Sequence, residues 1–337
     1  MQRHGNLKRL WCNYDSLLQA WVEVKRNKSY HFSILAYEQN LAVNLSTLLD
    51  KLEDGSYSPR ELRKFYIHDP KTRLIEAPCL EDRIVQHALL SVIRPLIEVR
   101  LIDQTFACRK FKGTHASNDL LKSYLIAYKN EGYCLKIDIE KFFYTIDQNV
   151  LELQIEEIIK CRPTLNILKK FYGSETGKGL PLGNVTSQVL ANLALNPIDH
   201  FIKRVLKIRH YVRYMDDCIL LSDSKNELNY ARILIIQELE KLKLKVNNKT
   251  KISRIKDGID FVGYRTWYNR RIIRKRSLYK IKRKLKKNAD QNRMASFMSH
   301  AMNTNSLVYV IKQILKVVPE RREWIIKWYV KHKIAKR

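Results

Sequence analysis

The sequence predicts an α+β protein in which helices surround antiparallel strands. Apolar residues recur at helical spacing through residues 1–60, and short β-prone runs bounded by turn residues alternate with helical segments in the middle of the chain. Residues 266–337 are helical in pattern and strongly basic. At 337 residues the chain is long enough for two or three domains with cores of their own.

The net charge indicates a polyanionic partner. The chain carries 63 Lys and Arg against 34 Asp and Glu, a formal net charge of +29. An enzyme for small metabolites gains nothing from such a field, whereas a nucleic-acid binder releases counterions from phosphates with it.

The cysteines and the hydropathy pattern indicate a cytoplasmic protein. Six cysteines are scattered without a Cys-x-x-Cys pair, which disfavours structural zinc and a disulfide framework and suits a reducing compartment. The start of the chain lacks an apolar signal core, and no segment is apolar enough for a membrane span. We therefore expect no membrane partner.

Residues 1–59 are predicted to be helical, and Asp54-Gly55-Ser56 and Pro59 close this region. We favour the interpretation that these helices form an N-terminal packing layer. The alternative is that they help to grip a template strand. A hairpin follows over residues 64–77, with Asp69-Pro70-Lys71-Thr72 as its turn and Arg73 on the returning strand. Cations there suit a nucleoside triphosphate, because a guanidinium fork matches phosphate oxygens. A solvated turn is the competing interpretation.

Residues 106–117 form a basic loop before another helix. Its cations suit the backbone of a template strand. For Phe106 and Phe111, core packing is favoured over stacking on bases. The proposed template contacts are Arg109, Lys110 and Lys112.

An acid stands on an apolar, strand-like run at Asp138. An isolated carboxylate in such a run is costly unless it is paired or binds a metal. Residues 211–222 add two β-prone runs around Met215-Asp216-Asp217, which predicts a tight hairpin with adjacent carboxylates at its tip. A lone Asp-Asp is usually a solvated turn, but with Asp138 it completes the set of acids that a two-metal polymerase palm requires.

Residues 180–197 form a loop that turns into an apolar helix. Gly183 lets the backbone approach a ligand closely. Ser187 and Gln188 stand in the first turn of the helix, where backbone amides favour an anionic or polar neighbour.

Beyond the hairpin we expect an amphipathic helix over 227–242, a strand and turn over 244–250 and one short strand over 261–267. Residues 270–287 contain many Lys and Arg and no acid, with Leu278, Ile281 and Leu285 as an apolar stripe. This pattern predicts a basic helix that grips a nucleic-acid duplex, a membrane-surface helix being the weaker option. The expected duplex contacts are Arg274, Lys275, Arg276, Lys280, Arg283 and Lys284.

In this order the motifs resemble those of reverse transcriptases, over about residues 60 to 265. The matching segments are Arg73 to Gln86 and 106–117 in the fingers, Lys136 to Asp147 (motif A), Tyr214 to Asp217 (motif C), 247–250 (motif D) and 261–263 at the end of the palm. The resemblance implies a right-hand polymerase fold. Its parts would be an N-terminal helical region at 1–59, fingers at 60–130, palm segments at 131–147 and 179–265, connecting helices at 148–178 and a basic helical thumb at 266–337.

The motif-B segment, Leu182-Gly183-Asn184-Val185-Thr186-Ser187-Gln188, narrows the resemblance. Most bacterial relatives have Gln before the Gly and end the motif with Ser-Pro. This segment instead resembles the reverse transcriptases of diversity-generating retroelements. The resemblance implies copying of a template RNA into cDNA with frequent errors at adenines, to diversify a target gene, and a small basic accessory variability-determinant protein as partner.

The resemblance also implies roles for single residues. Asp138 and Asp216 would ligate two Mg²⁺ ions, Asp217 would support the site, and Ile139 would add its backbone carbonyl as a ligand. Phe143 would face the sugar C2′ position of the incoming deoxynucleotide and exclude ribonucleotides. The remaining nucleotide contacts would be Lys71 and Arg73 at the triphosphate, Lys249 at the pyrophosphate side, and Leu182, Gly183 and Gln188 near the nucleotide and template.

Two other functions stay open. An intron-type or host-defence reverse transcriptase would share the fold but copy accurately or lack a variable-region target. A non-enzymatic RNA-binding scaffold would keep only the fold, and the intact acids, Phe143 and Lys249 argue against it.

Overall fold

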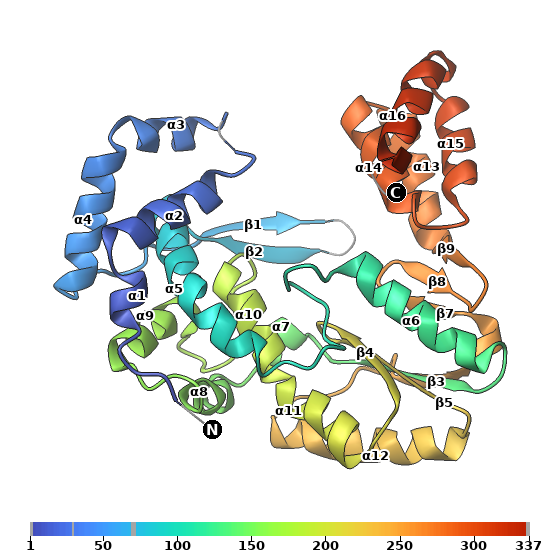
Figure 1. Cartoon of the computed structure of the whole chain (residues 1–337), viewed down its shortest axis with the longest axis horizontal. Helices are drawn as coiled ribbons and strands as arrows, with labels where there is room; N and C mark the ends of the chain where they lie inside the picture. The colour runs from blue at the N-terminus through green and yellow to red at the C-terminus, as the bar shows by residue number, and fades with distance from the viewer. Residues whose placement is uncertain (1–2, 29, 69–71, 335–337) are drawn as a thin grey trace. The chain divides into compact units, whose positions relative to one another are not determined.

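The computed structural model describes residues 3–28, 30–68 and 72–334, which form two compact units (Figure 1). The first unit comprises residues 1–108, 138–207 and 233–248, and the second comprises residues 109–137, 208–232 and 249–337. Helices accompany antiparallel strands in both units, so the predicted α+β class is confirmed. Across the described ranges, no helix has the length and apolar character needed to cross a bilayer.

The helical core of the first unit forms around α5 (Leu80–Glu98). Helices α2 (Tyr14–Lys25) and α10 (Val185–Ala194) pack against α5 and bury side chains such as Trp21 and Leu89. The other helical elements of this unit are α1 (Lys8–Trp11), α3 (Phe32–Gln39), α4 (Leu41–Glu53), α7 (Phe142–Thr145), α8 (Gln148–Glu156), α9 (Arg162–Tyr172), α11 (Asn196–His200) and η1 (Phe201–Val205).

A two-stranded hairpin projects from this helical core. Strands β1 (Arg63–Ile67) and β2 (Arg73–Ala77) pair antiparallel, with Arg63 opposite Ala77 and Ile67 opposite Arg73. The predicted hairpin is therefore confirmed. Part of its predicted turn, residues 69–71 and so Lys71, lies outside the described residues.

The second unit is built on a four-stranded sheet in the order β4-β5-β3-β6. Central strands β3 and β5 carry runs of buried apolar side chains, as strands covered on both faces do. Helix α6 (Thr114–Tyr128) packs against β4, and α12 (Lys225–Lys241) follows β5. The strands are β3 (Tyr133–Asp138), β4 (His210–Tyr214), β5 (Asp217–Ser222) and β6 (Lys251–Arg254).

The segment between this sheet and the C-terminal helices differs from the prediction. The single strand expected over 261–267 is wrong, because Val262 and Gly263 take φ values of 40° and 89° and reverse the chain. Likewise, the strand expected over 244–250 is reduced to one bridge between Val246 and Ile139. A three-stranded sheet, β7 (Ile259–Phe261), β8 (Tyr264–Thr266) and β9 (Arg271–Ile273), follows the short η2 (Ile255–Asp257).

The basic helix predicted from residue 270 starts only at Lys275, because residues 271–273 pair with β8 as strand β9. Its apolar stripe is confirmed: Ile281 and Leu285 are buried in a cluster with Met294, and Leu278 packs against that cluster. The helices of this part are α13 (Lys275–Lys287), α14 (Gln291–Ala301), α15 (Leu307–Leu315) and α16 (Arg322–Ile334), with η3 (Pro319–Arg321) before α16.

Candidate active site

The predicted acid-bearing hairpin is present. Strands β4 and β5 pair antiparallel, Tyr214 lies opposite Asp217, and Met215 and Asp216 form the two-residue turn between them. Met215 takes a φ of 54°, as the first turn residue of a primed two-residue hairpin must. Asp216 and Asp217 are both half-buried at this tip.

The carboxyl end of β3 lies beside the start of β5. At the other end of this strand pair, a Cβ placed on Gly132 would meet the Ser222 carbonyl oxygen at 3.0 Å, so the beginning of β3 lies at the end of β5. Near the carboxyl end of β3, the Lys136 ammonium lies 2.8 Å from Oδ1 and 2.9 Å from Oδ2 of Asp217. Lys136 was part of the motif-A match, but sequence reasoning gave it no role.

Asp138 is the last residue of β3 and is half-buried. Its carbonyl accepts a hydrogen bond from Asn247 N at 2.7 Å, and Glu140 N donates to the Lys245 carbonyl at 2.8 Å. Carbonyls of successive strand residues point to opposite sides, so the Ile139 carbonyl points away from the 245–247 segment.

These groups suit a hard cation. Carboxylate and carbonyl oxygens are the donors that Mg²⁺ takes in proteins, usually together with water and substrate phosphates. Within the part of the chain that the structure describes, no three His, Cys, Asp or Glu side chains gather into a metal site of their own.

The motif-B loop is fastened to the β1–β2 hairpin. Glu76 N on β2 donates to the Leu182 carbonyl at 2.7 Å. Gly183 has a φ of 148°, and a Cβ there would lie 2.3 Å from the Glu76 carbonyl oxygen. Only glycine allows so close an approach of two backbones. The structure thus brings Leu182 and Gly183 to the strand that begins with Arg73.

A buried glutamine positions the helix after this loop. The side-chain oxygen of Gln86 on α5 accepts from Val185 N, the first residue of α10, at 3.1 Å. Asn184 just before it donates its side-chain amide to the Phe171 carbonyl at 2.7 Å. Gln188 lies exposed in the first helical turn, as predicted. The positioning role of Gln86 was missed, since it depends on a contact across 99 residues of sequence.

Phe143 and the motif-B segment are also joined. Phe143 is half-buried on α7, and its carbonyl accepts from Leu180 N at 2.7 Å. Its neighbour Phe142 is buried in the core, with the two rings edge to face at 5.7 Å. The Phe142 ring therefore packs in the core, whereas the adjacent Phe143 ring is partly accessible to solvent.

The other expected nucleotide contacts are exposed. Arg73 begins β2 in the first unit, and Lys249 lies in the turn before β6 in the second. Both side chains are accessible to solvent.

Asp147, the last residue of the motif-A segment, caps helix α8. Its carboxylate accepts from Val150 N at 3.0 Å and from the Lys243 ammonium at 2.8 Å. Burial raises the pKa of Asp147, but these donors outweigh burial and hold it below the ordinary value of 3.8. This acid stabilises the start of α8.

The two aromatic side chains of the basic loop differ in their burial. Phe106 is buried, as predicted, whereas core packing is wrong for Phe111, whose side chain is 93% exposed. Phe111 has a φ of 60°, and the Lys110 ammonium lies 5.7 Å from its ring centroid. An exposed cation beside an exposed ring suits a nucleic-acid strand. Arg109 and Lys112 are half-buried.

Most of the residues expected to contact a duplex from α13 have side chains that are at least partly accessible to solvent. Lys275, Arg276 and Arg283 are exposed, and Lys280 and Lys284 are half-buried. Arg274 is engaged elsewhere: its backbone N–H donates to the Gly263 carbonyl at 3.2 Å, and its Nε lies 3.4 Å from the Tyr264 carbonyl. Arg274 holds the start of α13 against β8.

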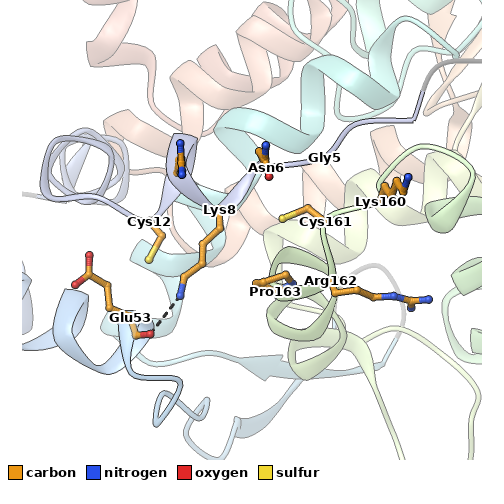
Figure 2. A pocket seen from close by; sticks show the side chains of 10 residues that line it. Gly5, Asn6, Lys8, Cys12, Glu53, Lys160, Cys161, Arg162 and Pro163 are labelled. Carbon is orange, nitrogen blue, oxygen red and sulfur yellow. Dashed lines mark hydrogen bonds between the residues drawn. The ribbon is translucent and has the colours of Figure 1, made fainter.

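A cavity of about 690 Å³ in the first unit contains none of the predicted site residues (Figure 2). The Lys8 ammonium on its wall donates to the Glu53 carbonyl at 3.3 Å. Arg162, also on the wall, pairs with Glu156 at 2.8 Å. Lys8 and Arg162 are thus engaged with acceptors of the chain itself.

Comparison with known proteins gives concordant matches. The family model described as reverse transcriptase (RNA-dependent DNA polymerase) matches residues 67–266. Protein YkfC of Escherichia coli K12 is 27% identical over 289 residues, which cover 72% of this chain and 74% of that protein. The group II intron-encoded protein LtrA of Lactococcus lactis is 24% identical over 170 residues, which cover 47% and 28%.

A solved structure of telomerase from Candida tropicalis, in complex with a fragment of telomeric RNA, aligns with a TM-score of 0.49 and 14% identity. The alignment covers 87% of this chain and 58% of the telomerase chain.

Proposed function

The chain belongs to the reverse transcriptase family of RNA-dependent DNA polymerases, and we propose that it makes error-prone cDNA from a template RNA to diversify a variable region of a target gene. The right-hand polymerase fold follows from the family. We assign residues 60–130 to the fingers, 131–147 and 179–265 to the palm and 266–337 to the thumb, with the helices of 1–59 and 148–178 around them.

The catalytic centre that we propose unites Asp138, Asp216 and Asp217. Asp138 ends β3, and the β4–β5 turn lies at the start of β5, beside the carboxyl end of β3. Asp138 and Asp216, with the Ile139 carbonyl, would hold two Mg²⁺ ions, while Asp217 supports the site. When bound there, Mg²⁺ would supply the Lewis acidity that activates a primer hydroxyl and the positive charge that steadies a triphosphate.

The nucleotide site that we propose lies between the fingers hairpin and motif B. Arg73 and Lys71 bind the triphosphate, and Lys249 serves the pyrophosphate side. The ring of Phe143 stands against the sugar and excludes a 2′-hydroxyl by its bulk. Its backbone bond to Leu180 supports this placement, because it joins Phe143 to the motif-B segment.

The observation that carries error-prone copying is Leu182 in the place of a polar glutamine. The hydrogen bond from Glu76 N fixes this residue in the loop beside Gly183. An apolar side chain cannot supply hydrogen bonds that discriminate correct from incorrect base pairs, so selection should weaken there. We propose that this loss, with Gln188 on the following helix, contributes to misreading of template adenine.

The partners of this activity are the template RNA, the RNA/cDNA duplex and deoxynucleoside triphosphates. We place the template along Arg109, Lys110 and Lys112 and the duplex along the exposed face of α13. A net charge of +29 favours such polyanions. A small basic accessory variability-determinant protein would complete the system, and the cytoplasm is the compartment we propose.

Accurate copying, as by a group II intron-type enzyme, is the second candidate, and the similarity to the intron-encoded protein favours it. The two are separated by sequencing cDNA that the purified protein makes from a defined RNA. Errors concentrated opposite adenine support diversification. Faithful cDNA, together with a gene neighbourhood that lacks near-identical repeats differing at adenines, supports the intron-type function.

A further inference from the structure

Lys136 connects three strands of the second unit through its ammonium group. Lys136 lies on β3, and its Nζ contacts both carboxylate oxygens of Asp217 on β5, at 2.8 and 2.9 Å. The same ammonium donates to the Asp260 carbonyl on β7 at 2.9 Å. The side chains of Lys136 and Asp217 are 22% and 23% exposed, so their charges are partly shielded from water.

The pair lies close in sequence to the other two acids of the proposed metal site. Side chains two residues apart on a strand project to the same face, so Lys136 shares a face of β3 with Asp138. Asp217 follows Asp216 directly at the hairpin tip. Carboxylates that converge on one metal site repel one another, and a nearby ammonium offsets that repulsion.

We propose that Lys136 is a positioning residue of the polymerase site. It holds the Asp217 carboxylate in one orientation and offsets the negative charge of the acids when no metal is bound. Through the Asp260 carbonyl it also links the acid-bearing end of the sheet to the β7–β8 hairpin. This inference rests on the proposed assignment of Asp217 to the catalytic site.

If the Lys136 ammonium and a bound metal ion both interact with the Asp217 carboxylate, two consequences follow. Without the ammonium, the unliganded protein should be less stable, because the Lys136–Asp217 ion pair is lost. Metal ions should bind at lower concentration, because they no longer compete with Lys136 for the same negative charge. Lys136→Arg should preserve both properties, since it keeps the positive charge.

Thermal melting of the full chain without nucleic acid measures both effects. In EDTA, Lys136→Met should lower the melting temperature by about 2 to 4 °C. The loss in the double variant Lys136→Met/Asp217→Asn should be smaller than the sum of the two single losses. Additive losses would show that the two residues are not coupled and would overturn the proposal.

Titration with Mn²⁺ alone gives the second readout. The Mn²⁺ concentration that half-maximally raises the melting temperature should be several-fold lower for Lys136→Met than for the unaltered chain. Lys251→Met is the matched control, because Lys251 pairs with Lys136 across β3 and β6 and is exposed. Equal midpoints for Lys136→Met and Lys251→Met contradict the proposal. Lys136→Gln takes the place of the methionine variant if the latter does not fold.

These measurements need no template, so their outcome does not depend on whether copying is error-prone. The site assignment is tested separately by primer extension with Asp216→Asn. If that variant keeps full synthesis, the proposed catalytic centre fails, whatever the melting experiments show.

Discussion

The Glu76 amide donates a 2.7 Å hydrogen bond to the Leu182 carbonyl, which fixes the motif-B loop to the fingers strand that begins at Arg73. The two halves of the proposed nucleotide site are therefore joined by backbone, not by side chains alone. A change that separates this loop from β2 should disturb nucleotide binding.

Gly183→Ala should disrupt this junction. The added Cβ would lie 2.3 Å from the Glu76 carbonyl oxygen, and a φ of 148° is unfavourable for alanine. We expect a loss of about 1 to 3 kcal/mol in stability and at least a tenfold fall in primer extension. Gly177→Ala is the control, because it also has a positive φ but no atom within 4 Å. Equal loss in both variants would mean that backbone strain alone, and not the contact with β2, explains the effect.

Leu182→Gln should place a polar group at the proposed nucleotide site. We expect the error frequency opposite template adenine to fall several-fold, with Leu182→Met as the apolar control. The measurement is sequencing of cDNA from a defined RNA template. An unchanged adenine error frequency in the glutamine variant would remove Leu182 from the account of infidelity.

Phe143→Ala should admit ribonucleotides. Removing the ring opens space for a 2′-hydroxyl, so ribonucleotide incorporation should rise by roughly tenfold to a hundredfold. Single-nucleotide extension with matched ribo- and deoxynucleotides measures the ratio. Phe142→Ala is the comparison, because that adjacent ring is buried in the core. Its loss should lower stability by about 3 to 5 kcal/mol without shifting sugar selectivity.

Asp147→Asn should reveal a pH-dependent stabilisation. The pKa of Asp147 in the folded chain is held below 3.8, so the ionised carboxylate stabilises the fold above that unfolded value. This contribution is lost as the pH falls through the still lower folded pKa. The variant keeps an N-cap acceptor but loses the ion pair with Lys243. Its melting temperature should therefore lie below that of the unaltered chain at about pH 7, and the difference should close as the pH falls below 3.8 and through the folded pKa. A constant difference would rule out this linkage.

Local signals account for the elements that were predicted correctly. The β4–β5 hairpin follows from two β-prone runs around a two-residue turn, and the α13 stripe follows from the spacing of Ile281 and Leu285. The error at 261–267 has a local cause as well. Val262 takes a φ of 40°, which a β-branched residue rarely adopts, so nothing in the sequence marked a reversal before Gly263.

Long-range contacts explain what the sequence did not reveal. The Lys136–Asp217 pair joins residues 81 apart, and the bond from Val185 N to Gln86 joins residues 99 apart. The spacing of apolar residues along the sequence does not predict which side chains so far apart will meet. Phe111 was assigned to a core because it is aromatic, yet its loop holds a left-handed backbone conformation and exposes the ring.

The most direct test of the central claim is primer extension by the purified chain on a defined RNA template with Mg²⁺, followed by sequencing of the cDNA, with Asp216→Asn in parallel. We predict synthesis by the unaltered chain with errors concentrated opposite adenine, and a fall of about a hundredfold or more in the variant. Synthesis with errors spread evenly over the four template bases would contradict diversification, and undiminished synthesis by the variant would contradict the active site.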